Sequence, residues 1–89
     1  MIAENSSQEH LALFRLQVTA EPDPNVLSRV LERFQNLNIL PRSVMAELGV
    51  REVLHIRIDV LGLDADRMTI IAAKLNEGTN ILAANWHCV

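Results

Sequence analysis

The spacing of apolar residues along the chain alternates between a period of two, typical of strands, and a period of three to four, typical of helices. His10 to Ala20 alternate, and one side of this segment is apolar: Ala12, Phe14, Leu16, Val18 and Ala20. From Pro24 to about Gln35 the apolar residues fall instead on one helical face: Val26, Leu27, Val30, Leu31 and Phe34. We therefore predict a strand that leads directly into a helix.

The turn between these elements reads EPDPN, from Glu21 to Asn25. Asp23 is suited to cap the helix, because its carboxylate can accept a hydrogen bond from a free amide of the first turn. Pro24 suits the first helical position, where its missing N–H has no intrahelical partner to lose. Asn36 is predicted to end the helix, because Asn tolerates a positive φ.

The middle of the chain reads as a β-hairpin. Asn38 to Leu48 is rich in apolar and β-branched residues, but Pro41 cannot donate to a central ladder, so this strand is predicted at an edge. Gly49 supplies the turn, and Glu52 to Leu61 alternates clearly, with Leu54, Ile56, Ile58 and Val60 on its apolar side.

A second helix and a last strand complete the pattern. Gly62 marks a break, Asp64 is the predicted N-cap, and the helical period continues until Gly78. Asn80 to Val89 then alternates, and the prediction groups four residues on one side of this strand: Leu82, Ala84, Trp86 and Cys88.

The resulting order, βαββαβ, predicts an α+β fold. Both crossovers must be right-handed, so the two helices cover the same face of a four-stranded antiparallel sheet, which is the ferredoxin-like sandwich. Its strand order is 4-1-3-2, which agrees with an edge position for the strand that contains Pro41. Residues 1–10 are predicted to be a polar N-terminal tail, and residues 11–89 a single domain.

Composition narrows the class of partner. The chain has 89 residues, a formal net charge of -3 and no basic cluster, which argues against nucleic acid as a partner. Cys88 is the single cysteine, so no intramolecular disulfide forms and a reducing cytoplasm is expected. No apolar run is long enough to span a membrane.

Catalytic or metal chemistry finds little support in the sequence. The first turn contains no cysteine pair for a soft metal, and its acidic residues would repel a phosphate. His55, Arg57 and Asp59 share one strand face, which fits a solvated or subunit-facing surface better than a catalytic row. We predict no catalytic residues, no metal site and no cofactor.

The run VTAEPDPNVLSRVLERFQNLNI resembles the opening of an ACT domain: a strand, an acidic residue, a proline, a V-L-x-x-V-L helix and N-I beyond it. ACT domains are regulatory modules that bind amino acids, typically between two paired domains. The resemblance implies a ligand loop formed by Asp23, Asn25 and Val26, with Asn38 and Ile39 contributed across the pair. Asn25 stands where the family usually has glycine, which lets a ligand approach the backbone.

The segment that begins at Pro24 is also similar to the short small subunit of acetolactate synthase; the matching residues are Pro24, Val26, Leu27, Arg29, Val30 and Leu31. This similarity implies a non-catalytic subunit that activates a thiamine-diphosphate-dependent large subunit in branched-chain amino-acid biosynthesis. A homodimer is expected separately, because an edge second strand offers a surface for pairing and a small domain gains most from burying more area. A free-standing sensor of a small amino-acid effector and a ligand-free structural dimerisation module are the alternatives.

Overall fold

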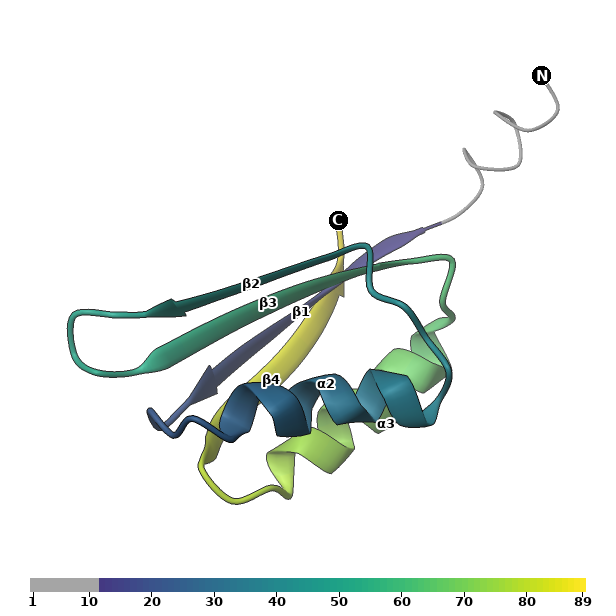
Figure 1. Ribbon diagram of the computed structural model, residues 1–89. Coiled ribbons are helices and arrows are strands. Elements are labelled where there is room, and N and C mark those ends of the chain that lie inside the picture. Colours follow the sequence, from purple (N-terminus) through teal and green to yellow (C-terminus); the bar gives the residue numbers. More distant parts are fainter. Residues whose placement is uncertain (1–11) are drawn as a thin grey trace, which may run out of the picture.

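The computed structural model of the chain describes residues 12–89, and the elements in this range follow the predicted order (Figure 1). They are β1 (Leu13–Ala20), α2 (Val26–Asn36), β2 (Ser43–Leu48), β3 (Leu54–Leu61), α3 (Ala65–Asn76) and β4 (Ile81–Cys88). The predicted polar tail, residues 1–10, lies outside the described residues, as does the start of the predicted first strand. Neither described helix is long and apolar enough to cross a membrane.

The four strands form one antiparallel sheet in the order β2-β3-β1-β4, and both helices lie on the same face of it (Figure 1). The ferredoxin-like prediction is therefore confirmed, including the edge position of β2. The central strands pair in register, so that Leu16 lies opposite Ile58 and Arg15 lies opposite Asp59. Because side chains alternate along a strand, Leu16 and Ile58 point toward the helices, whereas Arg15 and Asp59 point toward the open face.

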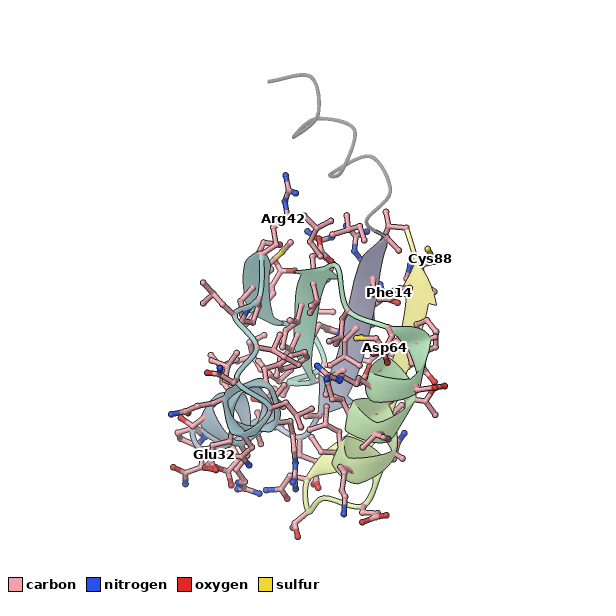
Figure 2. All side chains as sticks on the ribbon, turned by 90° about the vertical axis from the view of Figure 1, so that its right-hand side faces the viewer. Phe14, Glu32, Arg42, Asp64 and Cys88 are labelled. Atoms are coloured by element: carbon pink, nitrogen blue, oxygen red, sulfur yellow. The ribbon has the colours of Figure 1, made fainter. Side chains whose placement is uncertain are left out.

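The core lies between the sheet and the helices, where the side chains of both layers meet (Figure 2). The largest fully buried side chains come from β1, β3 and the inner faces of both helices: Leu16, Val18, Val26, Val30, Phe34, Ile56, Ile58, Val60, Met68 and Ile71. Each such side chain contributes about 1.5–3 kcal/mol by leaving water. The apolar faces predicted for both helices and both central strands are thus confirmed.

Two helix boundaries differ from the prediction. Helix α2 begins at Val26 rather than at Pro24, because Pro24 and Asn25 form a turn ahead of it. The left-handed residue after α2 is Asn38, with φ 59°, and not the predicted Asn36, which is the last helical residue. The second helix agrees with its predicted cap, since Asp64 Oδ1 accepts a hydrogen bond of 2.8 Å from the Arg67 amide.

The hairpin between β2 and β3 turns through a short loop rather than at Gly49 alone. The Gly49 amide donates to the Val53 carbonyl at 2.8 Å, and the Glu52 amide donates to the Gly49 carbonyl at 3.0 Å. Glu52 takes the left-handed conformation, with φ 57°. Strand β3 therefore begins at Leu54 instead of Glu52, and β2 begins at Ser43, beyond Pro41.

The face predicted for the last strand is wrong at its start. A bulge in the β1–β4 ladder pairs Ala20 with Ile81 and Thr19 with Ala83, which leaves Leu82 as the extra residue. Ile81 consequently packs against the core, whereas Leu82 is exposed. Beyond the bulge Trp86 packs edge-to-face on Phe14, with ring centroids 5.3 Å apart, and is partly buried against the core.

Candidate functional site

The predicted ligand loop is the turn between β1 and α2. The Glu21 amide donates to the Asn80 carbonyl at 2.8 Å, which fixes the turn to the segment before β4. The Val26 amide donates to the Asp23 carbonyl at 3.0 Å and closes the turn ahead of the helix. Backbone bonds therefore hold the loop at both of its ends.

The Asp23 carboxylate accepts hydrogen bonds that link parts of this loop, and it is not the helix cap that we predicted. Its Oδ1 accepts from the Asn25 amide at 2.8 Å, and its Oδ2 accepts from the Asn80 side-chain amide at 3.1 Å. An Arg29 guanidinium nitrogen also lies 3.8 Å from Oδ2. A carboxylate that accepts from the amide two residues ahead stabilises a turn. The N-cap position itself belongs to Asn25, whose side chain makes no capping bond.

Asn25 and Val26 have different roles in the structure. Asn25 is exposed and has a φ of -87°, which an ordinary residue adopts without strain, so the backbone here does not require the glycine usual in the family. Val26 is only 1% exposed and belongs to the core. The Asn25 side chain is therefore exposed at the loop surface, in the path of a ligand that approaches the backbone, whereas Val26 acts by holding the loop on the core.

An open hollow of about 360 Å³ lies beside this turn. Its lining joins the turn to the start of α2 and to the ends of the β2–β3 hairpin: Pro22, Asp23, Pro24, Leu27, Leu48 and Leu54. Apolar groups dominate this lining, so the hollow suits an apolar side chain. Leu48 and Leu54 were not among the predicted site residues, because only the folded sheet brings the hairpin to this turn.

Asn38 and Ile39 lie at the opposite end of α2. The Asn38 amide donates to the Gln35 carbonyl and the Ile39 amide to the Phe34 carbonyl, each at 2.9 Å. This pattern, with Asn38 left-handed, is a Schellman C-cap. Because α2 has 11 residues, the two halves of the predicted site lie about 16 Å apart in one chain, at about 1.5 Å per residue.

A second hollow, of about 620 Å³, surrounds Asn38 and Ile39. It runs between the end of α2 and the start of β2, and its lining also includes Leu31, Leu40 and Val44. Leu40 is 90% exposed, an unusual amount for a leucine next to an apolar hollow. Each end of β2 therefore has a hollow beside it, and each hollow contains part of the predicted site.

The two edges of the sheet differ in their free hydrogen-bonding groups. On β4, the Asn76 side chain bonds both backbone groups of Ala84: Oδ1 accepts from the amide and Nδ2 donates to the carbonyl, each at 2.9 Å. On β2, the Gly49–Val53 bond and the β2–β3 register direct the amides of Val44, Ala46 and Leu48 away from β3. All three of these β2 amides are open, whereas the β4 edge is occupied at Ala84 and open at Trp86 and Cys88.

An ion pair dominates the electrostatics of the open face. Arg15 Nε and Nη2 donate to the two carboxylate oxygens of Asp59 at 2.8 and 3.1 Å, and Ser43 Oγ lies 3.4 Å from the same carboxylate. The hydrogen bonds from Arg15 hold the pKa of Asp59 below its ordinary value. Asp59 is 8% exposed, so this member of the predicted polar row is a structural link between strands.

The described residues hold no group of three or more His, Cys, Asp or Glu side chains placed to bind a metal ion. His55 and Arg57, the other members of the predicted row, remain on the open face beside a separate hollow.

Comparison with known proteins agrees with the βαββαβ fold. The model of the ACT-like domain family matches residues 5–89. No protein of curated function is similar enough in sequence to match the chain.

Solved structures of several other proteins share the fold. The C-terminal domain of the MgtC protein from Mycobacterium tuberculosis is 16% identical, with a TM-score of 0.74 over 91% of this chain and 90% of that one. The ACT domain of GTP pyrophosphokinase from Chlorobium tepidum is 9% identical, with a TM-score of 0.70 over 84% and 96% of the two chains. A homoserine dehydrogenase from Thiobacillus denitrificans is 13% identical, with a TM-score of 0.68 over 91% of this chain and 18% of that one.

These likenesses are to ACT and related domains in general and do not point specifically to the small subunit of acetolactate synthase. The fold, the turn between β1 and α2, and the family match over residues 5–89 agree with one another, and the chain belongs to the ACT-like domain family.

Proposed function

We propose that this chain is a non-catalytic regulatory ACT protein that pairs with a second copy of itself along β2. The observation that carries the proposal is the contrast between its two sheet edges. Asn76 occupies the β4 edge at Ala84, while the outward amides of β2 have no partner among the described residues. An unpaired edge of this kind is a template for another strand.

The side chains of β2 also favour a partner. Val44 and Leu48 are 44% and 59% exposed although they lie on the helix side of the sheet, because α2 does not fully cover this edge. A second copy placed beside β2 would shield them from water. A domain of this size gains much from such burial, since alone it buries a smaller share of its surface than a large domain does.

Two-fold pairing along β2 would also complete the predicted ligand site. In each copy the start of β2 lies beside Asn38 and Ile39, and its end lies beside Asp23. A symmetric pair of β2 strands runs antiparallel, so the start of one strand meets the end of the other. The Asp23 hollow of one copy would then face the Asn38 hollow of its partner.

We further propose that the pair serves as the activating subunit of an amino-acid biosynthetic enzyme such as acetolactate synthase. The support is the similarity of the segment from Pro24 to Leu31 to the short small subunit of that enzyme. Mixing the purified chain with the large subunit should produce a complex that co-elutes and raise synthase activity. A chain that neither binds the large subunit nor changes its activity would refute this partner.

A free-standing amino-acid sensor is the second candidate, favoured by the apolar hollow beside Asp23 and Leu27. Calorimetric titration with the twenty amino acids tests it, with binding expected for those that have branched apolar side chains. Asn25→Gly should strengthen binding, because it opens the approach to the backbone. If no amino acid releases heat or shifts thermal unfolding, the sensor is refuted, and the ligand-free structural dimerisation module is then the remaining alternative to the activating subunit.

A further inference from the structure

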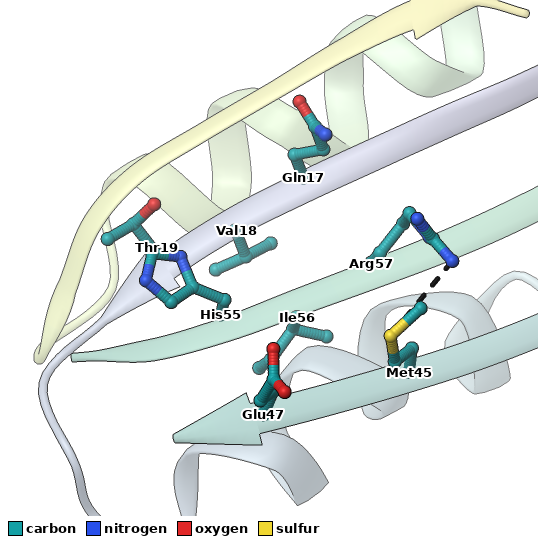
Figure 3. A pocket seen from close by; sticks show the side chains of 8 residues that line it. All are labelled: Gln17, Val18, Thr19, Met45, Glu47, His55, Ile56 and Arg57. Carbon is teal, nitrogen blue, oxygen red and sulfur yellow. Dashed lines mark hydrogen bonds between the residues drawn. The ribbon is translucent and has the colours of Figure 1, made fainter. Parts of the chain in front are cut away.

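A separate hollow of about 330 Å³ lies on the open face of the sheet, on the side away from both helices (Figure 3). Polar and charged side chains from three strands line much of it: Gln17 and Thr19 of β1, Glu47 of β2, and His55 and Arg57 of β3, with the apolar residues Val18, Met45 and Ile56 completing the lining. Its volume falls at the lower end of the range for small-molecule sites, about 300–1,000 Å³. None of these residues belongs to the ligand loop that the family resemblance implies.

The strand register arranges these side chains in two rows across the sheet. Arg57 is paired with Gln17 on one side and with Met45 on the other. One step along the face, His55 is paired with Thr19 and Glu47 in the same way. Side chains directly opposite each other on neighbouring strands lie about 4.5–5.5 Å apart at Cβ, so each row can contact one small ligand.

Arg57 forms no salt bridge among the described residues, although, in addition to the hydrogen bonds from Arg15, its charge helps to lower the pKa of Asp59. The nearest acid on its own strand, Asp59, is already held by Arg15 through two hydrogen bonds of 2.8 and 3.1 Å. Within residues 12–89, the one hydrogen bond of the Arg57 side chain is to Met45 Sδ at 4.0 Å, and a thioether is a weak acceptor (Figure 3). A guanidinium has five N–H donors in a planar fork that matches a carboxylate.

Glu47 supplies the opposite charge in the neighbouring row. Within residues 12–89 it forms no salt bridge, and it lies diagonally across the strands from Arg57, at a separation of about 7–8 Å for such pairs. The hollow thus contains one positive and one negative group that do not neutralise each other directly. A ligand with several negative charges would be repelled by Glu47, whereas one with both charges would meet a complement at each end.

We propose that this hollow binds a small zwitterion, a molecule with one carboxylate and one ammonium group. The carboxylate accepts hydrogen bonds from Arg57 and from the Gln17 side-chain amide, and the ammonium group donates to Glu47. Thr19 and His55 provide further polar contacts between the two ends. The site is independent of the β2 pairing proposed above, because its donors and acceptors point from the sheet face and not from the strand edge.

Chemical-shift mapping of the whole chain with 4-aminobutyrate tests this assignment, because its charges lie at opposite ends of a short flexible chain. Backbone amides near Gln17, Thr19, His55 and Arg57 should shift in a saturable manner. Acetate, propylammonium and inorganic phosphate should each bind at least about tenfold more weakly, since each loses one charge-assisted contact or meets repulsion from Glu47.

Single substitutions test the positive end and the negative end of the site separately. Arg57→Gln and Glu47→Gln should each weaken 4-aminobutyrate binding by about tenfold or more. The matched charge-neutralising controls Arg33→Gln and Glu32→Gln, on α2 at the other side of the sheet, should leave binding unchanged. The inference is overturned if millimolar 4-aminobutyrate shifts no open-face amide, or if phosphate binds as tightly. Shifts confined to the turn around Asp23 would overturn it as well, while leaving the proposed pairing intact.

Discussion

Asn80 donates its side-chain amide to Asp23 Oδ2 across 3.1 Å, and this bond joins the β1–α2 turn to the segment that enters β4. Asn80 can occupy this place because it has a φ of 73°, a left-handed conformation that Asn tolerates better than most residues. Its carbonyl also accepts from the Glu21 amide. Asn80 therefore positions the predicted ligand loop from the far end of the chain.

Replacing Asn80 should loosen this loop and lower stability. Asn80→Ala loses the bond to Asp23 and places a β-carbon in the left-handed region, so the free energy of unfolding should fall by about 1–3 kcal/mol. Urea denaturation measures this change. Asn80→Gly is the matched control, since glycine keeps the backbone conformation without strain. If both variants lose the same stability, the left-handed backbone is not the reason for asparagine here.

Acid should weaken the link between Arg15 and Asp59. Hydrogen bonding from Arg15 lowers the pKa of Asp59 from its ordinary value of 3.8. A carboxyl whose folded pKa is depressed contributes stability above its unfolded pKa, and that contribution is lost as the pH falls through the folded value. The contribution is thus complete at neutral pH and declines below about pH 4.

Unfolding curves of Asp59→Asn and of the wild type, measured from neutral pH to pH 2, test this dependence. The variant should be less stable at neutral pH, and its disadvantage should shrink as acid protonates Asp59 in the wild type. Arg15→Gln should produce a similar loss at neutral pH, and the double variant little more than either single one. A disadvantage that stays constant across the pH range would contradict the assignment.

The β4 edge depends on Asn76. Its side chain satisfies the amide and the carbonyl of Ala84, a residue that is 3% exposed. Asn76→Ala should therefore lower the free energy of unfolding by about 1–3 kcal/mol, because a buried backbone group loses its partner. Thermal unfolding measures the loss, and hydrogen exchange at the Ala84 amide should accelerate. Unchanged exchange at that amide would show that Asn76 does not protect it.

The hairpin turn should gain stability from glycine at one position. Glu52 has a φ of 57°, a conformation in which a side chain other than Asn or Asp costs about 1–2 kcal/mol. Glu52→Gly should raise the free energy of unfolding by about 0.5–1 kcal/mol after the entropy cost of glycine is included. Arg51→Gly, at a neighbouring position where φ is not positive, should instead lower it. Equal effects of both variants would argue against strain at Glu52.

The sequence predicted the elements, the strand order and the core faces. These features depend on the spacing of apolar residues that lie close together in the chain, at alternate positions in strands and at helical intervals in helices. The prediction was wrong where the position or role of a residue depends on residues far away in the chain. The bulge that exposes Leu82 arises from the β1–β4 register. Asp23 links the loop to the segment before β4 because Asn80, at a separation of 57 residues, donates a hydrogen bond to its carboxylate.

The candidate site was predictable only in part, for the same reason. The turn residues Asp23 and Asn25 could be identified from the local pattern EPDPN. Leu48 and Leu54 complete the hollow only after the hairpin packs beside that turn. Whether Asn38 and Ile39 meet Asp23 depends on a second copy and remains a prediction.

Pairing along β2 is best tested through the outward amide of Ala46. Proline at this position has no N–H to donate to a partner strand, while the ladder to β3 does not use that amide. Two-fold symmetry removes the bond twice, so Ala46→Pro should weaken pairing by about 2 kcal/mol, or roughly thirtyfold in Kd. Ala46→Thr, which keeps the amide, and Leu82→Glu, on the β4 side, are the controls and should leave Kd unchanged.

Sedimentation velocity of the full chain at micromolar concentration gives the most direct answer. The wild type should sediment as a dimer, and a folded Ala46→Pro variant, verified by circular dichroism, should sediment mainly as a monomer. A monomeric wild type, or a dimer that Ala46→Pro leaves intact, would contradict pairing along β2.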